Sequence, residues 1–77
     1  EFFHIPIDNY IITYLDGNIY VYDTTMKLLD MEKTNTNNID DLVLLSNEEK
    51  ITIIITTQNS SISNIYKYNK KGNNFIK

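Results

Sequence analysis

The side chains of this sequence that could take part in chemistry are mainly carboxylates. Asp16 and Asp23 stand at the two ends of one short apolar segment, and the doublets Asp40-Asp41 and Glu48-Glu49 follow later in the chain. Two carboxylates held close together can divide general acid and base roles between them. Acidic doublets can also attract a basic partner or a cation. The chain has a single histidine, His4, which could act as a base.

Each of these groups also has a simpler structural interpretation. Asp favours tight turns, so Asp16 beside Gly17 and Asp23 ahead of Thr24 are typical of turn residues. The acidic doublets lack the alternating acidic residues and the glycine of a calcium-binding loop. The sequence contains no cysteine to pair with His4. We therefore expect a protein that is not an enzyme, with no catalytic residues, no cofactor and no metal site.

Composition restricts the possible partners and compartment. The chain has 77 residues, a net charge of −3 and no arginine, and a small acidic domain of this kind argues against nucleic-acid binding. No segment reaches the roughly 20 apolar residues that a membrane-spanning helix needs, so we expect no membrane contact. The absence of cysteine fits a reducing compartment. We therefore expect an intracellular protein, either cytoplasmic or nuclear.

Eight short segments are rich in β-branched and aromatic residues and are bounded by turn residues, so they predict strands. They are Phe2–Ile7, Tyr10–Leu15, Asn18–Asp23, Met26–Glu32, Ile39–Ser46, Ile51–Thr57, Ser63–Asn69 and Asn73–Ile76. The strongest turn signal is Asp16-Gly17, because a two-residue hairpin turn needs positive φ at both central residues. The connections have hairpin length, and we therefore predict an all-β, antiparallel fold.

The segment Met26–Lys33 is open to two interpretations. Its Met, Leu, Lys and Glu residues favour a helix, which Asp23 or Thr24 could cap. Its apolar residues also fit a fourth strand, and the internal repeat of the chain requires a strand at this place. We favour the strand.

Two parts of the chain resemble each other. Asn18–Asp23 recurs as Asn64–Asn69, and the apolar run Tyr10–Thr13 ahead of the first copy has a counterpart in Ile53–Thr56. These alignments predict a short insertion at Gln58–Ser61 in the second copy. Repeated units of this length cannot bury their apolar faces alone, so we expect neighbouring units to stack.

The first repeated strand supports this expectation of stacking. Ile19 and Val21 point to one face of a strand, and Tyr20 and Tyr22 point to the other. Because both faces carry large apolar groups, we expect this strand to be covered on both sides.

The segment from Asp16 to Asp23 resembles the end of a WD repeat, in which an acidic-Gly turn leads into a strand closing with an aromatic-Asp pair. Tyr22-Asp23 stands where that family has Trp-Asp, and Tyr68-Asn69 takes this place in the second copy. The Gly-His pair of the family is missing from both copies, and the same segment is also similar to quinoprotein-type propeller repeats. The resemblance implies antiparallel four-stranded blades of a β-propeller fragment, with one blade in residues 1–37 and the next in residues 38–77.

The resemblance implies a non-enzymatic protein-interaction scaffold within a larger multi-protein assembly, whose protein partners include the rest of the propeller ring. Loops on a rigid scaffold commonly carry such contacts. The candidates are Lys33–Asn38 and, above all, the loop of Gln58, Asn59, Ser60 and Ser61. Two alternatives remain open. One is an autonomous small β or α+β ligand-binding module that uses its tyrosines, and the other is part of an enzymatic quinoprotein-type propeller with active residues elsewhere in the ring.

Overall fold

The chain folds into two antiparallel four-stranded sheets in the computed structural model, which describes residues 2–36, 38–57 and 63–77. Sheet 1 contains β1 (Phe2–Ile7), β2 (Tyr10–Leu15), β3 (Asn18–Asp23) and β4 (Leu28–Lys33) in that order. Sheet 2 contains β5 (Ile39–Ser46), β6 (Lys50–Thr57), β7 (Asn64–Asn69) and β8 (Asn74–Phe75) in the same order. The predicted all-β, antiparallel fold class is confirmed, and within each sheet every strand pairs with its neighbours in the sequence.

The strand interpretation of Met26–Lys33 is confirmed, and the helical alternative is wrong. The strand β4 begins at Leu28, two positions later than predicted, because a turn occupies the preceding residues. Met26 has a φ of 66° and its N–H donates to the Asp23 carbonyl at 3.0 Å, while the Asp23 N–H donates to the Lys27 carbonyl at 3.0 Å. These bonds reverse the chain between β3 and β4 before regular pairing starts.

The predicted hairpin turn at Asp16-Gly17 is also confirmed. Asp16 has a φ of 50° and Gly17 a φ of 84°, so both adopt the left-handed conformation that the short turn requires. Leu15 and Asn18 pair directly across it. The Gly17 carbonyl then accepts hydrogen bonds from the Thr34 N–H at 2.8 Å and from the Thr34 hydroxyl at 2.7 Å. The turn is therefore tied to the link between the two sheets.

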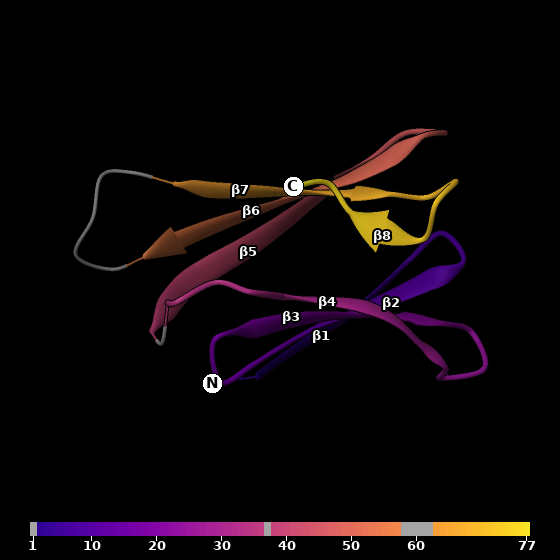
Figure 1. The fold of residues 1–77 in the computed structure, drawn as a ribbon. Helices are drawn as coiled ribbons and strands as arrows, with labels where there is room; N and C mark the ends of the chain where they lie inside the picture. Colours follow the sequence, from indigo (N-terminus) through magenta and orange to yellow (C-terminus); the bar gives the residue numbers. More distant parts are fainter. Residues whose placement is uncertain (1, 37, 58–62) are drawn as a thin grey trace.

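The two sheets lie one on top of the other and run in the same order (Figure 1). The first strands of the sheets, β1 and β5, are in contact, and the last strands, β4 and β8, are in contact at the other edge. Corresponding strands therefore occupy corresponding places in the stack. The second sheet repeats the first along the stack instead of mirroring it.

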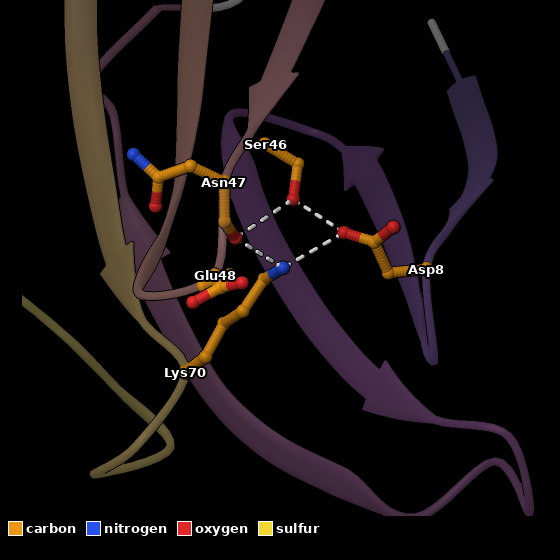
Figure 2. Close-up of a pocket in the computed structure, with 5 residues that line it drawn as sticks. All are labelled: Asp8, Ser46, Asn47, Glu48 and Lys70. Carbon is orange, nitrogen blue, oxygen red and sulfur yellow. Dashed lines mark hydrogen bonds and ion pairs between the residues drawn. The ribbon is translucent and has the colours of Figure 1, made fainter.

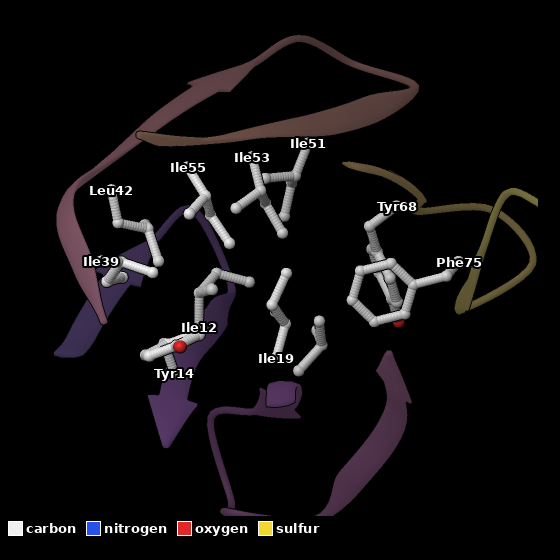
Figure 3. Close-up of a cluster of buried hydrophobic side chains, with 11 residues drawn as sticks. Ile12, Tyr14, Ile19, Ile39, Leu42, Ile51, Ile53, Ile55, Tyr68 and Phe75 are labelled. Carbon is white, nitrogen blue, oxygen red and sulfur yellow. The ribbon is translucent and has the colours of Figure 1, made fainter. Parts of the chain in front are cut away.

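The core lies between the sheets (Figure 3). Sheet 1 contributes Ile12, Tyr14, Ile19 and Val21 from its two central strands. Sheet 2 contributes a row of isoleucines on β6, which packs against them. The alternation of β6 explains the row, because Ile51, Ile53 and Ile55 share one face of the strand and all are fully buried. Tyr68 and Phe75 close the core near β8, with ring centroids 5.3 Å apart in an edge-to-face arrangement.

Strand pairing gives the true correspondence between the two copies. Asn64 lies opposite Ile55 in sheet 2, as Asn18 lies opposite Leu15 in sheet 1. Ile55 therefore corresponds to Leu15, and the alignment of Tyr10–Thr13 with Ile53–Thr56 predicted from the sequence is wrong by an odd number of residues. A shift of that kind moves every side chain to the other face of the strand.

The corrected correspondence shows that the two sheets use opposite faces in the shared core. Ile19 is fully buried against sheet 2, whereas its counterpart Ile65 is 58% exposed on the outer side of sheet 2. Tyr68 is fully buried against sheet 1, whereas its counterpart Tyr22 lies on the outer side of sheet 1, where it helps to line a surface hollow. When the two sheets are compared as repeats of one unit, the face of sheet 1 that packs in the core is therefore the opposite of the face that sheet 2 uses.

Truncation of one core isoleucine tests this packing. We expect Ile53→Ala to lower the free energy of unfolding by about 2–5 kcal/mol, because the fully buried side chain leaves a cavity that β6 cannot collapse. The same truncation at Ile76, which is 43% exposed after β8, is the matched control and should cost less than about 1 kcal/mol. Urea denaturation followed by circular dichroism measures both, and equal midpoints for the two variants would contradict the assignment of the core.

Candidate functional site

Three turns from distant parts of the chain meet in a polar cluster at one end of the stack (Figure 2). We call this cluster the polar junction; it consists of Asp8, Ser46, Asn47, Glu48 and Lys70 around a hollow of about 290 Å³. Lys70 Nζ lies 2.8 Å from Asp8 Oδ2 and 2.6 Å from the Asn47 carbonyl oxygen. The Ser46 hydroxyl donates to the same Asp8 oxygen. Each sheet therefore contributes to one hydrogen-bonded group.

The electrostatics of the polar junction favour an ionised Asp8. The hydrogen bond from Lys70 is the main cause that lowers the pKa of the Asp8 carboxyl, followed by the hydrogen bond from Ser46, and partial desolvation opposes them. Lys70 is the better shielded member of the pair, with a side chain that is 15% exposed against 49% for Asp8. A carboxylate that stays ionised accepts hydrogen bonds, and Asp8 in this way connects its own turn to Ser46 and to the turn that contains Lys70.

No pattern in the sequence indicates that Asp8 and Lys70 meet. Each is part of a turn that local residues predict, but the two turns belong to different sheets and come together only when the sheets stack. The Asp8 carboxylate and the Lys70 ammonium form an ion pair across the interface between the sheets, which we call the clasp.

The predicted turn aspartates lie where the sequence places them, and they do not form a carboxylate pair. Asp16 lies in the turn before β3, and Asp23 is the last residue of β3. Asp23 Oδ1 accepts hydrogen bonds from the Thr25 hydroxyl at 2.6 Å, the Thr25 N–H at 2.8 Å and the Lys27 N–H at 3.0 Å. The Thr25 hydroxyl is the main cause that lowers the pKa of Asp23, with the Lys27 N–H next. Asp23 therefore caps the β3–β4 turn.

The second-copy residues Tyr68 and Asn69 have different surroundings from Tyr22 and Asp23. Burial is the main cause that raises the pKa of Tyr68 to about 12, and its ring packs against Tyr10 at a centroid distance of 5.7 Å. Asn69 Oδ1 accepts a hydrogen bond from the Lys71 N–H at 3.1 Å and so begins the β7–β8 turn. Tyr68 serves as a core residue, and Asn69 replaces Asp23 in turn formation.

The outer side of sheet 1 carries an apolar surface that includes several predicted residues. We call it the aromatic face; its hollow of about 470 Å³ is lined by Phe2, His4, Thr13, Leu15, Tyr20, Tyr22 and Met26. The rings of Tyr20 and Tyr22 stack with centroids 6.4 Å apart. Both tyrosines are half-buried, so the expected cover on this side of β3 is absent within the described chain.

His4 belongs to this aromatic face. Its Nδ1 lies 3.2 Å from the Thr13 hydroxyl, and its ring stacks on Phe2 with centroids 5.9 Å apart. These contacts orient the imidazole on the outer side of sheet 1. His4 thus forms part of this surface, and its polar contact there is with the buried Thr13 hydroxyl.

Of the two loops predicted to contact partners, the structure describes only part of one. Gln58, Asn59, Ser60 and Ser61 lie outside the described residues. In the Lys33–Asn38 link, Thr34 is buried and bonded to Gly17, and the Tyr14 hydroxyl donates to the Thr36 carbonyl. The described part of this link therefore connects the sheets tightly and offers less free surface than a loop of its composition suggests.

Comparison with known proteins yields no relative: no protein-family model, no curated protein and no solved structure matches the chain. Nothing in residues 2–36, 38–57 and 63–77 forms a helix long and apolar enough to cross a membrane. In the same ranges, no group of three or more His, Asp or Glu side chains lies close enough together to hold a metal ion.

The clasp makes stability depend on pH in a predictable direction. Because folding lowers the pKa of Asp8, the clasp stabilises the fold fully above the ordinary pKa of an aspartate, about 3.9, and loses its effect as pH falls through the lower folded value. We expect Asp8→Asn to be less stable at neutral pH and to lose less further stability on acidification. Chemical denaturation from about pH 6 down to pH 2 measures this.

Asp40→Asn is the matched control, because Asp40 is an exposed aspartate of β5 outside the polar junction. It should follow the wild-type pH profile. Asp23 shifts in the same direction as Asp8, so some acid dependence must persist in Asp8→Asn. An unchanged profile for Asp8→Asn would show that the clasp contributes nothing to folding.

Proposed function

We propose that this chain is a pair of consecutive blade-like units of a β-propeller of the WD-repeat kind, and that it serves as a non-enzymatic scaffold for protein–protein contacts inside the cell. The other members of the stack are its first partners. Proteins that bind the loops or edges of the assembled stack are the second class of partners.

The observation that carries this proposal is the use of opposite faces by equivalent residues. Ile19 lies in the shared core whereas its counterpart Ile65 lies on the outer side of sheet 2, and Tyr68 lies in the core whereas its counterpart Tyr22 lies on the outer side of sheet 1. Two sheets that close on each other with the same face end a structure, whereas sheets joined by opposite faces can be followed by further sheets. Radial repetition of four-stranded sheets is how a propeller is built.

The surroundings of the acidic residues favour a scaffold over an enzyme. The carboxylate of Asp8 holds two turns together across the sheets, and that of Asp23 caps a turn within sheet 1. Both are therefore occupied in fixing the shape of the molecule. A shape fixed by turns and by a core between sheets is what a binding platform requires.

A covalent tandem repeat of the chain tests the proposal. Two copies are joined by a flexible linker of roughly ten residues, which is long enough to lead from β8 of the first copy to β1 of the second. If the units extend a stack, the linked copies bury a new pair of faces at a high effective concentration. The tandem protein should then unfold in one transition at a higher denaturant concentration than the single chain.

The single chain with the same linker at its C-terminus is the control for effects of the linker itself. Urea denaturation at low protein concentration compares the two proteins. If the tandem protein unfolds at the midpoint of the single chain, its two copies are independent and the proposal of stackable repeat units fails.

A further inference from the structure

The aromatic face covers most of the outer side of sheet 1. Cross-strand partners share a face, so His4, Thr13, Tyr20 and Met31 form one row across all four strands. Large apolar groups on this side remain substantially exposed, among them Phe2 at 59%, Met26 at 53% and Leu28 at 48%. A contiguous apolar surface of this kind on a small soluble domain marks a place where another molecule binds.

The repeat indicates what kind of surface fits the aromatic face. Phe2 pairs with Leu15 as Leu42 pairs with Ile55, and Leu28 pairs with Tyr22 as Phe75 pairs with Tyr68. All four counterparts in sheet 2, namely Leu42, Ile55, Tyr68 and Phe75, are buried against the inner face of sheet 1. The aromatic face of sheet 1 thus corresponds to the inner face of sheet 2, which packs against sheet 1.

The outer side of sheet 2 is the reciprocal surface. We call it the aliphatic face; its central row is Val43, Ile54 and Ile65, with Leu45 beside it. Ile65 is the counterpart of Ile19, which packs into the core, and Leu45 is 57% exposed. The aliphatic face of sheet 2 therefore corresponds to the inner face of sheet 1, which packs against sheet 2.

We propose that the aromatic face binds the aliphatic face of a second copy of this chain, in a head-to-tail contact that continues the stack. The proposal rests on the repeat units of the proposed function and adds a defined partner and a defined pair of surfaces. The contact already present between the sheets is its template. Because the two surfaces differ, the association is heterologous, and each bound copy leaves one face open for another.

One residue tunes the strength of this contact. Lys67 on the aliphatic face is exposed and corresponds to Val21, which is fully buried in the existing core. A lysine in this place must be brought against the tyrosines of the aromatic face, so the association of free chains is weaker than the contact between the linked sheets. Lys67→Val restores the residue of the first copy without touching the core of the monomer.

Sedimentation velocity of the 77-residue chain, from micromolar concentrations up to about 1 mM, measures the association. We expect concentration-dependent growth for the wild type and at least roughly tenfold tighter association for Lys67→Val. Tyr22→Lys removes the aromatic face, and Ile65→Lys removes the aliphatic face. Each variant should be monomeric alone, and an equimolar mixture of the two should form a 1:1 complex through the one intact pair of faces.

Thr24→Lys, in the exposed β3–β4 turn, is the control for an added lysine and should associate as the wild type does. Circular dichroism of each variant establishes that it is folded, and Leu28→Lys replaces Tyr22→Lys if that variant unfolds. A wild type that stays monomeric at about 1 mM, self-association that survives in both face variants, or a mixture that stays monomeric would each overturn the proposal. A tandem protein that gains stability while free chains stay monomeric would leave the proposed function standing and remove only this inference.

Discussion

The structure depends on the contact between the inner faces of its two sheets. A four-stranded sheet that carries Ile, Val and Tyr on both faces is stabilised when one of these faces is buried against another element. The row of Ile51, Ile53 and Ile55 meets Ile12 and Ile19 across the interface, and this contact removes one face of each sheet from solvent.

The polar contacts hold this interface in register at its two ends. The clasp of Asp8 and Lys70 joins turns of the two sheets at one end, and the bonds of Thr34 to Gly17 fix the link between the sheets. At the edge where β4 meets β8, Asp30 accepts a hydrogen bond from the Phe75 N–H at 2.8 Å. Apolar packing provides the attraction between sheets, and these directional bonds determine which residues face each other.

Local features of the fold could be predicted from the sequence, and features that depend on stacking could not. The Asp16-Gly17 turn and the bounds of β1, β2, β3 and β5 follow from turn chemistry and from runs of β-branched residues. The register of β6 was beyond sequence reasoning, because its uniform isoleucines and threonines fit any register and only the pairing of Ile55 with Asn64 decides it. The Asp8–Lys70 clasp joins residues whose proximity no local pattern encodes.

Repetition of the sheets without mirroring also says what kind of unit this pair is. Stacked repeat proteins end in capping units whose outward surfaces are polar, because a terminal apolar surface would make the protein insoluble. Both outward surfaces here expose large apolar groups: one displays tyrosines and a phenylalanine, and the other a row of aliphatic side chains with the exposed Lys67 beside it. In the proposed stack, neighbours on both sides would shield the apolar side chains that these two outward surfaces expose.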